Sequence, residues 1–340
     1  MVENFIFFVF ALALTYIANR KNLFPNFTGD IHQKFFNEKK IPLIGGVLVL
    51  VLLLRFYYAH DYFINLVFLS IFLIGFFSDS KILSSPRLRL YLQLLITIIF
   101  VLYFKIEVTP TKLNFFDNLL QNHYLSYSFT IFCFMILING SNFIDGLNGL
   151  LLGYILLIFF ALTTNNLILF SGLDELAINY LFYSLILIIV LNYSNFLYLG
   201  DGGAYLLGLF TGYILITIYN SPAIVSPYYI ILLLWYPCFE NLFSLLRKFL
   251  NSQSPVKPDN RHFHQIIFLF LKYKFKSKNI LLINITSSLM INFYNLVIFF
   301  IASKNPNLTI LQLKLILVSI FIYCILYYIL NKRIHLFIKK

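Results

Sequence analysis

Charged residues are scarce in this sequence: they make up 11% of its 340 residues, whereas hydrophobic residues make up 60%. A soluble globular domain has about a quarter charged residues and about half apolar ones. A chain this apolar cannot hide its surface in one soluble core, so a lipid bilayer is its expected solvent. The apolar runs are too long and too uniform for membrane β-strands, which alternate over about ten residues. The expected fold class is an all-α polytopic membrane protein.

Cysteine is also rare, with Cys133, Cys238 and Cys324 all lying inside apolar runs and without metal-ligand spacing. We interpret them as small core or lipid-facing residues. The first apolar run lacks a basic leader and a small-residue cleavage site, which indicates a retained span and not a signal peptide. No linker or internal repeat is evident, so residues 1–340 are expected to form a single integral-membrane domain. Its longest polar stretch, residues 247–279, is interpreted as a large cytoplasmic loop.

The apolar runs predict about eleven transmembrane helices, several of them shorter than the usual ~20 residues. These runs are Phe5–Asn19, Leu43–Tyr58, Tyr62–Phe77, Leu90–Phe104, Tyr124–Ile138, Leu147–Thr163, Ile178–Phe196, Ala204–Tyr219, Tyr228–Leu246, Ile280–Ala302 and Leu308–Leu330.

The basic residues set the expected orientation. The net charge is +12, but the Lys and Arg residues fall in short loops, which argues for membrane topology and against nucleic acid. The loops after the odd-numbered runs, with the C-terminal tail, hold 20 of the 25 basic residues. Because cytoplasmic loops are rich in Lys and Arg, we expect a periplasmic N-terminus, a cytoplasmic C-terminus and an inner (plasma) membrane location. The other five basic residues are Arg55, Lys105, Lys112, Lys304 and Lys314.

Acidic residues gather on the same predicted side, although the side was assigned from Lys and Arg alone. Asp79, Asp145, Asp201 and Asp259 come from four separate loops. Three of them have a plain structural alternative, which for Asp79 is a solvated loop acid. Asp145 lies in a run of Asn and Gly that suits a helix cap and turn, and Asp201 can be a helix N-cap. The functional alternative is a Mg²⁺ site, since Mg²⁺ takes one or two carboxylates together with substrate phosphates.

Other polar residues near these acids have two readings as well. Arg87 and Arg89 follow Asp79 and are either positive-inside charges or ligands for a lipid phosphate. Glu240 lies near the end of an apolar run and is either functional or paired with Arg247 and Lys248. The cluster Arg261-His262-Phe-His264 suits phosphate and uracil binding better than zinc, which needs three or four ligands.

In this order, the segments resemble the polyprenyl-phosphate N-acetylhexosamine-1-phosphate transferases, glycosyltransferase family 4, and within it the branch that initiates surface polysaccharides. The resemblance runs from residue 42 to residue 264. It rests on Gly45-Gly46 opening the second run, an acid after the third, Asn142-Phe-Ile-Asp145-Gly-Leu-Asn148-Gly, Leu199-Gly200-Asp201, and the late His262-Phe-His264.

The resemblance implies transfer of a sugar-1-phosphate, GlcNAc-1-phosphate by preference, from a UDP-sugar to polyprenyl (undecaprenyl) phosphate, with release of UMP at the cytoplasmic face. It implies a role in O-antigen, lipopolysaccharide or cell-wall synthesis. A homodimer is left open. The residues expected to act are catalytic Asp79, Asp145 and Asp201; Asp201 with Asn142 on Mg²⁺ or Mn²⁺; and Asn139, Asn148, Arg87, Arg261, His262 and His264 on substrates.

Two departures from the family pattern matter. The family usually has two adjacent acids where this chain has Ser78-Asp79, and often a second acid where it has Asn148. Two alternatives therefore stay open. One is an inactive family member, and the other is a transporter or flippase. The acids lie at the ends of the apolar runs, whereas a transporter places ionisable groups near the bilayer midplane.

Overall fold

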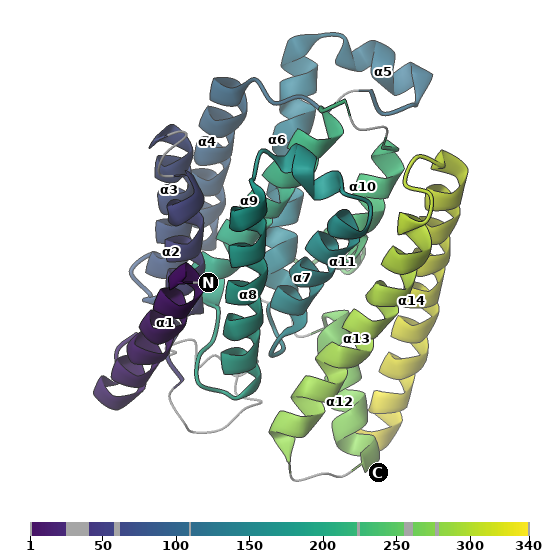
Figure 1. Ribbon diagram of the computed structural model, residues 1–340. Coiled ribbons are helices and arrows are strands. Elements are labelled where there is room, and N and C mark those ends of the chain that lie inside the picture. The colour runs from purple at the N-terminus through teal and green to yellow at the C-terminus, as the bar shows by residue number, and fades with distance from the viewer. Residues whose placement is uncertain are drawn as a thin grey trace.

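The computed structural model describes residues 2–24, 41–57, 62–108, 110–222, 225–254, 261–275 and 279–338, and within these ranges it is helical. The expected all-α class is confirmed. Among the described residues, fourteen α-helices and one short 3-10 helix, Leu167–Ser171, follow one another in sequence (Figure 1). The α-helices are α1 Val2–Lys21, α2 Gly45–Tyr57, α3 Tyr62–Asp79, α4 Pro86–Phe104, α5 Asn114–Leu120, α6 His123–Ile144, α7 Leu150–Thr164, α8 Glu175–Tyr193, α9 Gly200–Tyr219, α10 Pro227–Leu233, α11 Trp235–Leu250, α12 Phe263–Phe275, α13 Ile280–Ser303 and α14 Thr309–Ile338.

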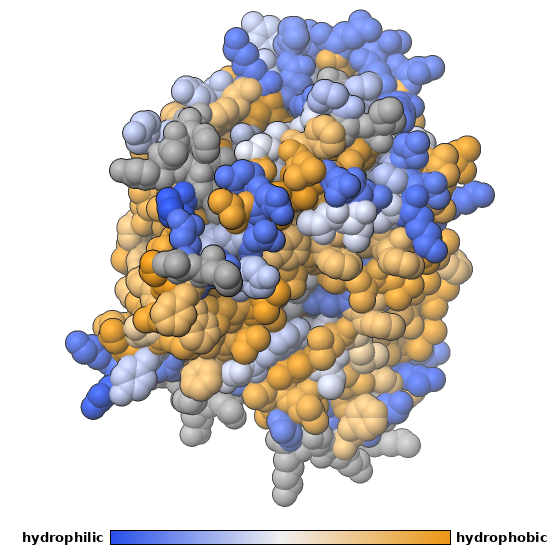
Figure 2. Space-filling model, in the orientation of Figure 1, coloured by the Kyte–Doolittle hydropathy of each residue, from blue (hydrophilic) through white to orange (hydrophobic). Residues whose placement is uncertain are grey.

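Seven helices of the described chain are long and apolar enough to cross a membrane: α3, α4, α6, α8, α9, α13 and α14. An eighth span results if α10 and α11 count as one, and α2 and α7 contain shorter apolar helices. The protein is therefore polytopic, while the count of eleven spans and the orientation remain predictions. Figure 2 shows a broad hydrophobic band across the visible face of the molecule, with hydrophilic residues gathered above it.

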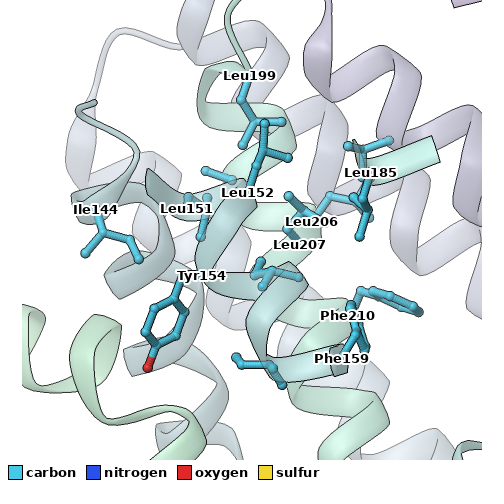
Figure 3. Close-up of a cluster of buried hydrophobic side chains, with 14 of the residues drawn as sticks. Ile144, Leu151, Leu152, Tyr154, Phe159, Leu185, Leu199, Leu206, Leu207 and Phe210 are labelled. Atoms are coloured by element: carbon cyan, nitrogen blue, oxygen red, sulfur yellow. The ribbon is translucent and has the colours of Figure 1, made fainter. Parts of the chain in front are cut away.

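Helix α9 lies at the centre of the bundle and packs along α2, α3 and α6. Its apolar side chains meet those of α7 and α8 in a buried cluster (Figure 3). The labelled members are Ile144, Leu151, Leu152, Tyr154, Phe159, Leu185, Leu199, Leu206, Leu207 and Phe210. Burial of such side chains contributes about 1.5–3 kcal/mol each, so this cluster fixes the position of the first turn of α9.

Glycine lets α3 approach α9 closely. A Cβ atom on Gly75 would overlap the backbone nitrogen of Gly202. The Gly45-Gly46 pair that opens α2 has a related role, since its two N–H groups donate to the carbonyls of Tyr198 and Leu199 at 2.9 Å each. The residues that precede α9 are thus held by the start of α2.

One expected span is broken. The run Tyr228–Leu246 forms α10 and α11, which meet at an angle of 73°. Pro237 has no N–H to donate to the carbonyl of Leu233, four residues earlier, and this disfavours a continuous helix. The Leu233 carbonyl instead accepts the hydroxyl of Tyr154 at 2.9 Å.

The stretch 247–279 is not a simple loop over its described part. Arg247 to Leu250 belong to the end of α11, and α12 occupies Phe263–Phe275. Helix α12 packs on α13 and α14 at the end of the bundle opposite α5 (Figure 1). Phe263, Ile266, Ile267 and Phe268 are buried there, and this apolar spacing explains the helix. Asp259 lies outside the described residues.

Candidate active site

Three acids from three helix ends come together at one end of the bundle. Asp79 is the last residue of α3, Asp145 directly follows α6, and Asp201 lies in the first turn of α9. The charges of Asp79 and Asp201 both act on Asp145, which places the three carboxylates in one electrostatic cluster. The sequence predicted this grouping from loop positions, and the antiparallel helices bring it about.

Asp201 makes the most contacts of the three. Its Oδ2 atom accepts the hydroxyl of Ser78 at 2.8 Å and lies 3.1 Å from Nη1 of Arg89. The side chain of Asn142 also hydrogen-bonds to it. The N-cap of α9 is Leu199. Asp201 therefore does not cap its own helix, and its side chain faces α3, α4 and α6.

Asp79 supplies the cap that α9 lacks. Its carboxylate accepts the backbone N–H groups of Asp201 and Gly202, which belong to the unpaired donors at a helix N-terminus. Gly200, with a φ of +78°, lies directly against Oδ2 of Asp79, where a Cβ atom would sit only 2.6 Å from that oxygen. A carboxylate at this place is stabilised by the helix dipole. Asp79 therefore links the end of α3 to the start of α9.

The ionised form of Asp145 is disfavoured in this cluster. Burial raises the pKa of its carboxyl well above the usual range, and the charges of Asp201 and Asp79 raise this pKa further. Arg89 is the cation that pairs with this group of acids in the described chain. When all three acids are ionised, one paired arginine leaves an excess of negative charge, which a cation would neutralise.

The two histidines of α12 and its approach lie against the turn that follows α6. The ring of His262 packs on Phe143 with centroids 4.9 Å apart, and the ring of His264 is parallel to that of His262 at 5.7 Å. His264 is fully buried against Gly146, and both of its ring nitrogens lack a partner within the described ranges. Burial lowers the pKa of His264 to about 3, so the imidazole is neutral.

Three other predicted residues, Asn139, Arg87 and Arg261, lie in different surroundings. Asn139 donates to the side-chain oxygen of Gln93 at 3.1 Å and to the carbonyl of Met135 at 2.9 Å. Arg87 is exposed at the start of α4, and the backbone carbonyl of Arg261 accepts Tyr327 at 3.0 Å.

Asn148 is part of a separate group of asparagines. Its Nδ2 atom donates to the carbonyl of Asn192 at 2.8 Å and to Oδ1 of Asn195 at 2.6 Å, and its backbone N–H donates to Asn284 at 2.8 Å. These bonds hold the turn before α7 against α8 and α13.

Arg89, and not Arg87, is the arginine that reaches the acids. The two residues lie about 200° apart around a helix of 3.6 residues per turn, so only one can face the bundle. A signal for this was present in the sequence: Arg89, Gln93 and Thr97 form a polar i, i+4, i+8 line on an apolar helix, and Gln93 and Thr97 are fully buried.

Comparisons with known proteins agree with this arrangement. Residues 62–219, from α3 to the end of α9, match the family model described as glycosyl transferase family 4. The chain is 27% identical over 289 residues to an undecaprenyl-phosphate alpha-N-acetylglucosaminyl 1-phosphate transferase of Thermotoga maritima, covering 85% of each chain. From α3 to the end of α9 the chain therefore matches glycosyl transferase family 4, and over most of its length it is distantly similar to undecaprenyl-phosphate GlcNAc-1-phosphate transferases. These matches indicate a transferase, built as a polytopic membrane protein.

Other relatives match less of the chain. The protein of the same name from Escherichia coli K12 is 25% identical over 240 residues, 67% of this chain and 65% of that protein. A phospho-N-acetylmuramoyl-pentapeptide-transferase of Prochlorococcus marinus is 27% identical over 230 residues, 58% of this chain and 60% of that protein. The similarity thus extends to two named kinds of transferase.

The donor atoms of this site suit Mg²⁺ only in part. No group of three or more Asp, Glu, His or Cys side chains in the described residues is arranged to hold a metal. Mg²⁺ usually takes one or two carboxylates and completes its shell with substrate phosphates and water. Asp201 and Asn142 fit such an incomplete site, since both offer oxygen atoms and lie in contact.

Proposed function

We propose that the protein transfers N-acetylhexosamine-1-phosphate, with GlcNAc-1-phosphate favoured, from a UDP-sugar to polyprenyl phosphate. An oxygen of the lipid phosphate attacks the β-phosphorus of the UDP-sugar, the bond from that phosphorus to the bridging oxygen breaks, and UMP leaves. The products are UMP and a polyprenyl diphosphate-linked sugar. The names of the Thermotoga and Escherichia relatives support the sugar, and the family supports the class of reaction.

The observation that carries the proposal is the convergence of Asp79, Asp145 and Asp201 with Arg89 at one end of the bundle. Both substrates are phosphate anions, so catalysis depends on positioning and on neutralising charge. A transporter would instead present ionisable groups near the bilayer midplane. Here the acids lie at the termini of α3, α6 and α9, where a soluble nucleotide and a lipid headgroup can meet.

Each residue then has a role set by its surroundings. Asp201 and Asn142 would hold Mg²⁺, which would neutralise the pyrophosphate charge. Arg89 takes up a phosphate oxygen when the cation and substrates compete for Asp201. Asp79 keeps the first turn of α9 in place and adjoins the acceptor phosphate. That phosphate has a second pKa near 6, so it is mostly dianionic at neutral pH and needs no strong base.

The experiment is an assay of the purified full-length protein with polyprenyl phosphate, Mg²⁺ and a panel of UDP-sugars, with UMP release as the readout. UMP release that requires the lipid and is fastest with UDP-GlcNAc supports the proposal in full. Release with another UDP-sugar corrects the donor. No release with any donor, from protein that is monodisperse and thermally cooperative, overturns the proposal and leaves an inactive family member.

The side of the membrane is a separate part of the proposal. We place the site at the cytoplasmic face of the inner membrane because of the distribution of Lys and Arg. A cysteine at Ser80, next to the end of α3, tests this in a background without the three native cysteines. Labelling of that cysteine by an impermeant thiol reagent only after permeabilisation of spheroplasts supports a cytoplasmic site, and labelling from outside contradicts it.

A further inference from the structure

Glu240 is a fully buried carboxylate that binds three donors from two other segments. Its Oε1 atom lies 2.9 Å from Nδ1 of His262, and its Oε2 atom accepts the hydroxyl of Tyr323 at 2.8 Å. The backbone N–H of Phe263 lies 3.3 and 3.4 Å from the two oxygens. Glu240 on α11 therefore joins the start of α12 to the middle of α14.

These bonds define the state of the His262 ring. An ionised carboxylate only accepts hydrogen bonds, so the proton of a neutral imidazole must be on Nδ1. The Nε2 atom has no hydrogen-bond partner among the described residues. The hydrogen bond that one ring nitrogen makes determines which of the two nitrogens carries the proton. Glu240 thereby leaves Nε2 as the available edge of His262.

The position of His262 connects it to the acids. Its ring packs on Phe143, and the neighbouring Asn142 hydrogen-bonds to Asp201. The last turn of α6 thus carries the contact to His262 and the contact to Asp201 on adjacent residues.

The contacts described for Arg247, a basic residue that follows Glu240 on α11, go to groups other than Glu240. Arg247 donates to the hydroxyl of Tyr327 and, at 2.5 Å, to the backbone carbonyl of Arg261. The aromatic side chains around Glu240 exclude water, since Tyr323 is buried and packs against Phe263 and Phe239. In such surroundings the bond to His262 is strong and strictly oriented.

We propose that Glu240 is a positioning residue for the sugar-phosphate transfer: it fixes the tautomer and orientation of His262 so that Nε2 faces the UDP-sugar. This inference rests on the proposed function. Tyr323 assists by holding the second carboxylate oxygen, so the inward face of α14 also contributes to the donor site. Outer groups that orient a functional histidine typically change its activity about 10- to 100-fold when they are removed.

A double-mutant cycle tests the inference with Glu240→Gln, His262→Gln and the combination of the two. Glu240→Gln is expected to lower kcat/KM for the UDP-sugar by about 10- to 100-fold. In the His262→Gln background it should add no more than about 2-fold, because the two residues act as one unit. Losses that multiply in the double variant would show that Glu240 acts on the fold and not through His262, and would overturn the inference.

A second variant guards against misfolding of Glu240→Gln. Tyr323→Phe removes only the hydroxyl bonded to Glu240 and should also lower kcat/KM, by several fold. Its matched control is Tyr294→Phe, which removes the hydroxyl bond to Ser319 of 3.0 Å between α13 and α14 and should leave kcat/KM unchanged. Equal effects of the two Tyr→Phe changes would count against the inference.

The tautomer itself is measured by ¹⁵N NMR of imidazole-labelled protein in nanodiscs, with the His262 signal assigned from the His262→Gln variant. We expect the Nδ1–H tautomer in the native protein and its loss or averaging in Glu240→Gln. An Nε2–H tautomer in the native protein overturns the inference. If no UDP-sugar supports UMP release, the proposed function fails. A native Nδ1–H signal would then show that Glu240 orients His262 without a role in sugar-phosphate transfer.

Discussion

Arg89 reaches Asp201 along two routes: its Nη1 atom lies 3.1 Å from Oδ2 of Asp201, and it also donates to the Ser78 hydroxyl that bonds to that same oxygen. The half-buried Arg89 is thus paired with Asp201, the carboxylate that we propose as a Mg²⁺ ligand. Substrate phosphates can draw the guanidinium away, since arginine binds phosphate in a forked geometry. The pair therefore holds the site together before substrates arrive.

We predict that Arg89, which faces the bundle, contributes more to catalysis than the exposed Arg87. We expect Arg89→Gln to lower kcat/KM by at least about 100-fold, a loss of ~2.7 kcal/mol at 1.36 kcal/mol per decade. Arg87→Gln, on the exposed side of the same helix, is the matched control and should change kcat/KM by less than about 3-fold. UMP release at several ionic strengths measures both. A larger loss for Arg87→Gln would restore Arg87 as the phosphate ligand.

Asp201→Asn separates chemistry from helix capping. Because Leu199 is the N-cap of α9, the substitution removes no cap and the variant should insert and purify normally. We expect its UMP release to fall below detection. Mg²⁺ should raise the unfolding temperature of the native protein in the presence of UDP-sugar and fail to do so for the variant. Near-normal turnover would remove Asp201 from the metal site.

We expect the ionised Asp145 to destabilise the folded protein at neutral pH. Its pKa is raised in the folded protein by burial and by the two neighbouring acids, so the folded state favours the protonated form. The stability that this proton gives is present at low pH and is lost as pH rises through the raised pKa. Asp145→Asn should therefore raise the unfolding temperature at pH 7 more than at pH 4, while it lowers UMP release.

The control for this prediction is Asp174→Asn. Asp174 caps α8 by accepting the N–H of Ala177 at 2.7 Å, and asparagine caps equally well. The unfolding temperature of this variant should differ from that of the native protein by the same small amount at pH 4 and at pH 7. An unfolding temperature of Asp145→Asn that follows the native protein at every pH would show that the ionised Asp145 does not destabilise the folded protein.

The helical class and the grouping of Asp79, Asp145 and Asp201 followed from the sequence, because apolar runs set helix positions and antiparallel neighbours bring alternate loops to one end. The break at residue 234 did not follow from the sequence. It depends on the hydroxyl of Tyr154, which donates to the Leu233 carbonyl in place of the N–H that Pro237 lacks. The partner of Glu240 did not follow either, because the bond to His262 spans 22 residues and an undescribed segment. Contacts between distant segments depend on packing, which local spacing does not encode.

Asn148 illustrates the same limit. From the family pattern an acid at this place would be the natural residue, yet its Nδ2 atom donates to the backbone carbonyl of Asn192. A carboxylate cannot donate, so Asn148→Asp would bring two acceptors together in a buried place. We expect it to lower the free energy of unfolding by about 1–3 kcal/mol at pH 7. Chemical denaturation measures the loss, and an unchanged midpoint would show that the asparagine group can rearrange.

Ser78→Asp restores the second acid of the family pattern and tests whether this chain is impaired without it. The Ser78 hydroxyl donates to Oδ2 of Asp201 at 2.8 Å and accepts from Arg89. An aspartate in its place loses the donated bond, adds a carboxylate beside Asp201, and competes for Arg89. Like charges this close repel unless one is protonated or bound to a metal. We therefore expect lower thermal stability without Mg²⁺, partial recovery with it, and little or no gain in kcat.

The comparison variant for this last test is Ser78→Ala, which removes the hydroxyl without adding charge. If the hydroxyl orients Asp201, Ser78→Ala should lower kcat by about 10-fold, equivalent to ~1.4 kcal/mol, which is near the lower end of the range for a hydrogen bond to a charged group. Its unfolding temperature should change less than that of Ser78→Asp. A gain of about 100-fold in kcat for Ser78→Asp, worth ~2.7 kcal/mol, would contradict this reasoning. It would show that the second carboxylate is needed and that the serine hydroxyl is only a partial substitute for it.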